Sequence, residues 1–104
     1  MRTVRIHESA SQEAIEAGAR YERERPGLGF EFERAVAASL NLLEGELAPL
    51  TQVPGAAGAR GAMRLVLRRF PYDVVVQTRH DEMLVLAFAH HSRRPGYWRH
   101  RMRA

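Results

Sequence analysis

The chain has 104 residues, of which 45% are apolar, 16 are Lys or Arg, 12 are acidic and none is Cys. This length and apolar content fit a single folded domain over residues 1–104 and exclude a disordered tail. No apolar run approaches the roughly 20 residues of a membrane span, and no basic-then-apolar leader is visible, so we expect a cytoplasmic protein that does not contact membranes. The lack of Cys excludes disulfides, thiolate catalysis and zinc–cysteine sites.

The charge is unevenly distributed, and every basic residue is Arg. Residues 1–52 carry six Arg and nine acids, a net charge of −3, whereas residues 53–104 carry ten Arg and three acids, a net charge of +7. A GC-rich genome explains the absence of Lys, but guanidinium groups also suit phosphate recognition. The basic second half predicts a polyanionic or acidic partner.

The first half reads as one strand and two helices. Residues 2–7 alternate basic and apolar side chains, which predicts a short strand. Ser9, with Gln12 three residues later, resembles a capping box and predicts the start of a helix that ends at Pro26-Gly27. A second helix is expected over residues 30–46 and packs antiparallel to the first. Its apolar residues share one face: Phe32, Val36, Leu40, Leu43 and Leu47.

The second half reads as a loop followed by three strands. Residues 48–61 contain two Pro and three Gly and show no period, which predicts a loop. Residues 63–67 and 72–77 alternate, and residues 83–89 are almost wholly apolar, typical of a central strand buried on both faces. The fold class expected is α+β, in the order β-α-α-β-β-β. An antiparallel sheet is packed on one face by the two-helix hairpin, and its other face is open beside the C-terminal segment.

Residues 90–103 form the densest polar cluster, in which Arg and His alternate with one Tyr and the only Trp. Basic residues interleaved with aromatic ones can bind a nucleic-acid backbone and stack on its bases. The alternative is that Tyr97 and Trp98 pack on the sheet beside a solvated basic end. A lone Trp in a small domain is usually a packing residue, so we favour packing for Trp98. Both interpretations stay open for Arg93 and Arg94.

Three further groups are candidates for chemistry. His90 and His91 are adjacent in a strand and point to opposite faces, so no metal site is expected, and no cofactor is implied. His91 can act as an acid or base beside Arg93, Arg94 and Tyr97, although we favour the interpretation that it is an ordinary surface His at a strand end. Arg68 and Arg69 either extend the basic surface toward the C-terminal segment or protect an edge strand from aggregation.

The ordered set of motifs resembles the RelE/ParE superfamily of toxins from bacterial type II toxin–antitoxin systems. The resemblance covers nearly the whole chain and rests on the first helix ending in 26–29, Phe32, and the segment 69–72. It continues through Ala89-His90 to the C-terminal set: Arg93, Arg94, Pro95, Tyr97 and Trp98. It implies the fold derived above and a cognate antitoxin protein as partner, and it leaves the oligomeric state open.

The resemblance implies two alternative activities. The ParE-like branch inhibits DNA gyrase by binding, largely through its C-terminal region. The RelE-like branch cleaves mRNA in the ribosome, with His91, Tyr97, Arg93, Arg94 and Arg69 in the catalytic positions here. The sequence departs from that branch at Asp73, where a cation is usual, so we favour gyrase binding. The residues expected to contact the target are Arg64, Arg68, Arg69, Arg93, Arg94, Tyr97, Trp98 and Arg99. A degenerate, non-toxic member is a third alternative.

Overall fold

A computed structural model describes residues 2–103, which form a five-stranded sheet, a long helical hairpin and a C-terminal segment without regular strands. The elements in chain order are β1 (Thr3–Ile6), α1 (Glu8–Glu24), α2 (Leu28–Glu44), β2 (Thr51–Gln52), α3 (Ala56–Ala59), β3 (Ala62–Val66), β4 (Tyr72–Arg79), β5 (Glu82–His90) and the 3-10 turn η1 (Arg99–Arg101). None of the helices within residues 2–103 is long and apolar enough to cross a membrane.

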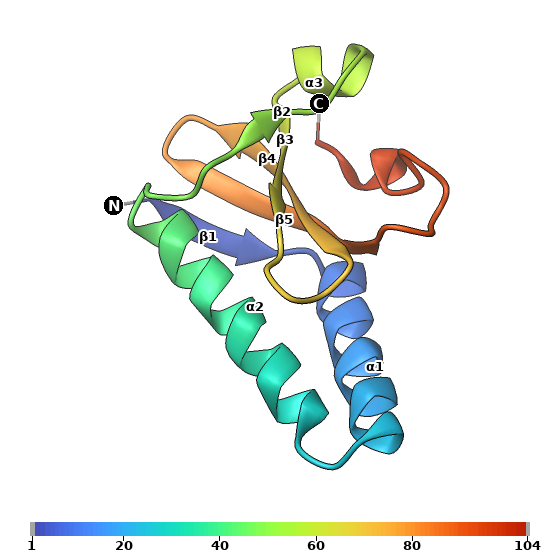
Figure 1. The fold of residues 1–104 in the computed structure, drawn as a ribbon. Helices are drawn as coiled ribbons and strands as arrows, with labels where there is room; N and C mark the ends of the chain where they lie inside the picture. The colour runs from blue at the N-terminus through green and yellow to red at the C-terminus, as the bar shows by residue number, and fades with distance from the viewer. Residues whose placement is uncertain (1, 104) are drawn as a thin grey trace.

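The sheet has the order β1-β5-β4-β3-β2 (Figure 1). The pairs β2–β3, β3–β4 and β4–β5 are antiparallel, and β1 runs parallel to β5. The α+β class and the three-strand meander are therefore confirmed. The prediction of a plain loop over residues 48–61 is wrong, because β2 and α3 lie within it. Backbone pairing with β3 creates the two-residue strand β2, and so short a strand carries no detectable side-chain period.

The helix boundaries differ from prediction at both starts. His7, not Ser9, caps α1, because its ring Nδ1 accepts a hydrogen bond from the Ser9 backbone N–H at 3.1 Å. The second helix begins at Leu28, where Glu22 accepts the backbone N–H groups of Gly27 and Gly29 at 2.9 and 3.0 Å. A carboxylate at this position also opposes the positive end of the helix dipole. Leu47 lies beyond the helix and is 74% exposed, so its predicted place on the buried face is wrong.

The helical hairpin packs on one sheet face and encloses the larger core. Four rings, Tyr21, Phe32, Phe70 and Tyr72, meet there with centroids 5.1–6.4 Å apart. Aliphatic side chains from β4 and β5 extend this core along the sheet, among them Val74, Val76, Val85 and Phe88. The aromatic cluster fixes the helical hairpin against the β3–β4 turn.

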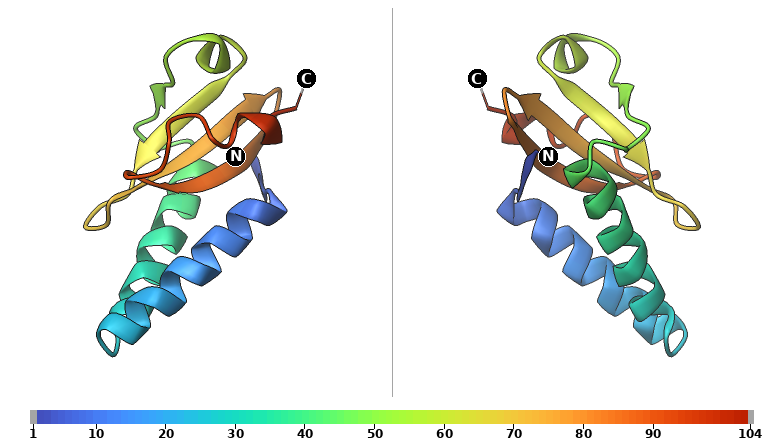
Figure 2. Two further views of the ribbon diagram at one scale, coloured as in Figure 1. Left: turned by 90° about the vertical axis from the view of Figure 1, so that its right-hand side faces the viewer. Right: turned by 90° about the vertical axis from the view of Figure 1, so that its left-hand side faces the viewer.

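The second sheet face is covered rather than open, which corrects the prediction. The C-terminal segment crosses the strands on this face (Figure 2), and Trp98, only 5% exposed, packs into a second apolar cluster with Ala57, Val75 and Leu84. The packing interpretation of Trp98 is therefore confirmed. The predicted burial of residues 83–89 on both faces is also confirmed, since all seven are buried.

A β-bulge in β5 turns two consecutive side chains toward this second face. Val75 pairs with Ala87, whereas Val76 pairs with Val85, so Leu86 is the extra residue. A bulge places neighbouring side chains on the same side of the sheet, and both Leu86 and Ala87 pack in the second cluster. The bulge also lies where β1 ends, because β1 pairs with β5 only as far as Val85.

Candidate binding cleft

A cleft of about 560 Å³ lies on the second sheet face, between α3 and the C-terminal segment. Its floor is apolar and includes Val53, Ala57, Val75 and Ala89. Its remaining lining carries most of the side chains that the sequence singled out: Arg64, Asp73, His91, Arg93, Arg94, Tyr97, Trp98 and Arg99. An apolar floor with a charged rim is the usual construction of a ligand or partner site.

The cleft arginines have no carboxylate partner among residues 2–103. Within residues 2–103, six arginines form ion pairs: Arg2, Arg5, Arg25, Arg69, Arg101 and Arg103. None of the cleft arginines, Arg64, Arg93, Arg94 and Arg99, is among the ion pairs of this described part. Their guanidinium groups are therefore available to an anionic ligand or an acidic partner surface.

His91 and Asp73 form a polar pair at the edge of the cleft. The ring Nε2 of His91 lies 3.0 Å from Oδ1 of Asp73, and the two side chains are 45% and 20% exposed. The backbone N–H of His91 donates to the carbonyl of Pro71 at 2.8 Å, which anchors the residue at the end of the sheet. Asp73 thus orients the imidazole at the edge of the cleft.

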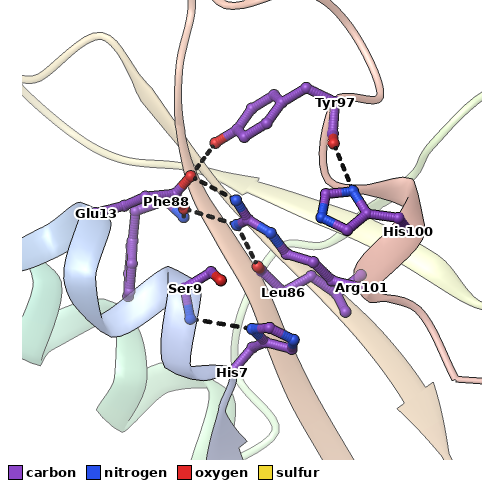
Figure 3. Close-up of polar contacts among 8 residues, drawn as sticks. All are labelled: His7, Ser9, Glu13, Leu86, Phe88, Tyr97, His100 and Arg101. Atoms are coloured by element: carbon purple, nitrogen blue, oxygen red, sulfur yellow. Dashed lines mark hydrogen bonds and ion pairs between the residues drawn. The ribbon is translucent and has the colours of Figure 1, made fainter.

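The C-terminal segment is fastened to α1 through Glu13 (Figure 3). One carboxylate oxygen accepts from the Tyr97 hydroxyl at 2.7 Å and from Arg101 Nη2 at 3.1 Å. The other accepts from Arg101 Nη1 at 3.0 Å and from the backbone N–H of Phe88 at 3.1 Å. The Arg101 and Glu13 side chains are only 9% and 16% exposed, so this bidentate pair is largely withdrawn from solvent.

The same network satisfies backbone groups of β5 beyond the point where its pairing with β1 ends. Arg101 Nη1 also donates to the carbonyl of Leu86, the bulge residue, at 2.9 Å. Two side chains therefore replace the missing strand by pairing with the backbone groups of Leu86 and Phe88. Further along the segment, the buried side chain of Gln77 accepts from the Arg103 N–H and donates to its carbonyl, both at 2.8 Å. These two attachments hold the segment over the sheet.

Tyr97 connects the Glu13 network to the cleft, because its hydroxyl bonds to Glu13 and its ring contacts Arg93. The Arg93 guanidinium carbon lies 3.9 Å from the centroid of the Tyr97 ring, and that of Arg101 lies at 5.2 Å. Burial, reinforced by the hydrogen bond to Glu13, raises the pKa of Tyr97 well above its usual value near 10. The phenol therefore keeps its proton, which is directed at Glu13, while its ring supports Arg93 at the rim of the cleft.

Comparison with known proteins identifies a solved structure of the same architecture. A chain from the "Chromosomal ParDE TA system from P. aeruginosa" superimposes with a TM-score of 0.68 at 16% identity, covering 86% of this chain and 96% of that one. No family model matches the sequence, and no curated protein resembles it closely enough to count as a match.

This chain has the fold of that ParDE chain. The α+β architecture implied by the RelE/ParE resemblance is therefore confirmed. The match spans nearly all of the ParDE chain and most of this one.

Within this ParDE-type fold, Arg68 and Arg69 lie away from the other predicted site residues. Neither lines the cleft. Arg69 adopts a left-handed backbone conformation, with φ 71°, and its Nη2 donates to Glu31 of α2 at 2.7 Å. The β3–β4 turn directs this side chain toward the helical hairpin, so a basic surface continuous with the C-terminal segment does not form there.

Glu13 and Arg101 are the two important residues that sequence reasoning missed. Glu13 stands in a Glu-rich helix whose acidic residues all look solvated, and Arg101 is one of several arginines near the C-terminus. No sequence spacing connects positions 88 residues apart. Among residues 2–103 there is no group of three or more His, Asp or Glu side chains that could hold a metal ion.

Proposed function

We propose that this protein is the toxin of a type II toxin–antitoxin system and that it inhibits DNA gyrase by binding rather than by catalysis. The observation that carries the toxin assignment is the fold shared with a chain of a ParDE system. Arg64, Arg93, Arg94 and Arg99 surround an apolar floor and form no ion pair within residues 2–103, which supports binding of an acidic macromolecular surface through the cleft. The buried side chain of Trp98 packs in the second apolar cluster and so helps to hold the C-terminal segment against the sheet.

The state of Tyr97 favours binding over catalysis. A nuclease needs an acid that can release its proton to the leaving oxygen. The Tyr97 hydroxyl instead donates to Glu13, and its raised pKa opposes proton loss. Asp73 adds a negative charge beside His91, where it opposes the approach of a scissile phosphate.

The direct test is the supercoiling activity of purified gyrase with added protein. We expect supercoiling to fall in proportion to the added protein, and Arg94→Gln to weaken this inhibition. Arg34→Gln, a change of the same charge on the helical hairpin, is the matched control and should inhibit as the unchanged protein does. Undiminished supercoiling at a large excess of protein contradicts a gyrase target. Unaffected growth on overexpression, with the antitoxin still bound, supports a non-toxic member instead.

The antitoxin is proposed to be acidic where it meets the cleft. Long-range attraction between such surfaces is screened by salt, with a Debye length of about 8 Å at 0.15 M ionic strength. Co-expression with the adjacent reading frame should yield a complex whose association slows as salt rises. Failure to co-purify contradicts an antitoxin encoded there.

Ribosome-dependent mRNA cleavage is a second candidate function, favoured by one specific observation. The 3.0 Å contact between His91 and Asp73 is the arrangement by which a carboxylate orients a histidine base. This candidate predicts mRNA cleavage in the ribosomal A site that His91→Ala abolishes. Because Tyr97 is bound to Glu13, Tyr97→Phe distinguishes the roles: cleavage that persists in it excludes Tyr97 as the acid.

A further inference from the structure

A second cavity, of about 320 Å³, lies on the helix side of the sheet, between α1 and the end of β5. It is separate from the cleft, because it is lined by Tyr72 and Phe88 of the helix-side core. His90 and Arg93 border both spaces. We call it the helix-side cavity. Its polar lining is rich in hydrogen-bond donors, and the gyrase and RNA proposals do not use Arg20, Tyr72 or His90.

Arg20 and Tyr72 supply the first donors. Arg20 Nη2 donates to the Tyr72 hydroxyl oxygen at 2.6 Å, and Arg20 takes part in no ion pair among residues 2–103. Because the Tyr72 oxygen is the acceptor in this contact, its own O–H proton points elsewhere, and no acceptor for it occurs among the hydrogen bonds of the described residues. Tyr72 is only 4% exposed, so the surrounding side chains fix the position of its hydroxyl group.

His90 and Ser92 fix the opposite wall. The Ser92 backbone N–H can only donate, and it lies 3.0 Å from His90 Nδ1, so Nδ1 is an acceptor and the proton of the neutral ring is on Nε2. The Ser92 hydroxyl also contacts Nδ1 at 2.8 Å. The ring stands edge-on to Tyr72, with centroids 5.0 Å apart. The imidazole is therefore held with an N–H donor free for a ligand.

The cavity also contains two carboxylates, Glu13 and Glu16, which differ in how far other groups of the protein already satisfy them. Glu13 already accepts four hydrogen bonds and is neutralised by Arg101. Glu16 is exposed and, within the described part of the chain, accepts only from Gln12, at 3.3 Å. After Arg101 neutralises Glu13, the lining keeps two cations, Arg20 and Arg93, against one carboxylate, Glu16, so its net charge is positive. An oxyanion is the ligand that satisfies such a set.

We propose that the helix-side cavity binds a phosphate group, held by Arg20, Tyr72 and His90, with Arg93 at its mouth. The volume accommodates the phosphate of a free ion or of a mononucleotide. A forked guanidinium and a phenol O–H suit the tetrahedral arrangement of phosphate oxygens. A phosphate here also brings Arg93 between two anionic ligands, one in each space.

The test titrates the full chain with inorganic phosphate at constant ionic strength and follows the His90 ring protons by NMR. We expect a saturable shift of these resonances. Arg20→Gln and Tyr72→Phe should each weaken the affinity by about tenfold, the effect of one charge-assisted hydrogen bond. Tyr72→Phe keeps the ring that packs on His90. AMP in place of phosphate separates the sources: tighter binding of AMP indicates a nucleotide, and equal binding indicates the free ion.

Two matched variants separate binding from folding effects. Glu16→Gln removes a repulsive charge without touching the core, so it should tighten phosphate binding, the opposite sign to the other changes. Arg34→Gln, on α2 and away from the cavity, should leave the affinity unchanged. The proposal is overturned if sodium chloride alone reproduces the shift, or if Arg20→Gln binds phosphate as Arg34→Gln does. Thermal melting of each variant verifies that it is folded.

Discussion

Glu13 is the residue on which the position of the C-terminal segment depends most. Removing its charge leaves the Arg101 guanidinium almost buried with no carboxylate, and breaking a buried pair in this way costs about 3–5 kcal/mol. We therefore expect Glu13→Gln to lower the free energy of unfolding by that amount, measured by urea denaturation. Glu16→Gln, one turn away and exposed, is the control and should change it by no more than about 0.5 kcal/mol. Equal effects of the two changes would contradict a structural role for Glu13.

Tyr97 makes stability depend on alkaline pH. Its pKa is higher in the folded protein than the usual value near 10, because burial and Glu13 disfavour the phenolate. Its contribution to stability is therefore complete below the unfolded pKa and is lost as pH rises from there toward the folded pKa. We expect the unfolding free energy to fall progressively as pH rises above about 10. Tyr97→Phe should show a shallower fall over this range, measured by denaturant unfolding at each pH, and parallel pH profiles would contradict the assignment.

At the level of residues, the sequence predicted which side chains meet in the cleft better than it predicted their partners. The basic and aromatic composition of residues 90–103 was visible, and it correctly indicated that Arg93, Arg94 and Tyr97 lie together. The Tyr97–Glu13 contact was not, because it spans 84 positions and joins residue types that are common on surfaces. Similarly, His7 was not expected as a helix cap because Ser9 is the stronger capping residue by type.

Among the elements, α1 and α2 pack closely where Gly29 of α2 meets the backbone of Gly18 in α1. A Cβ at Gly29 would lie 2.5 Å from the Gly18 carbonyl oxygen and 2.9 Å from the Glu22 Cβ, so Gly29→Ala must separate the helices. We expect it to destabilise the protein by about 1–3 kcal/mol, as overpacking does. Gly18→Ala is the natural control, since its Cβ meets nothing closer than 3.8 Å and Ala gains up to about 1 kcal/mol of helix propensity. Thermal unfolding of both variants should give shifts of opposite sign.

The order and type of the long elements followed from periodicity, whereas the short elements did not. Helices of 17 residues and strands of eight and nine residues carry a clear pattern of buried positions. The strand β2 has two residues and is defined by its pairing with β3, which is a property of the tertiary fold. The bulge at Leu86 is likewise invisible in an unbroken apolar run, since every position there is buried in either register.

Across the whole molecule, the acidic helical half and the basic half occupy different layers. The helical hairpin extends from one side of the sheet, and the Arg-rich segment lies on the other (Figures 1 and 2). Net charge alone acts at long range and attracts any anion, whereas the cleft acts through the placement of a few guanidinium groups. These two contributions can be separated by removing the same number of positive charges either from the cleft or from the helical hairpin and comparing the effects.

The paired variants Arg64→Gln/Arg94→Gln and Arg23→Gln/Arg34→Gln make that separation. Both reduce the formal net charge from +4 to +2, and none of the four arginines has a carboxylate partner within residues 2–103. Each substitution should therefore change stability by no more than about 0.5 kcal/mol. We expect growth arrest on induction to be lost in the cleft variant and retained in the helical one. Equal loss in both would assign the effect to overall charge, and equal retention would place the target-binding surface outside the cleft.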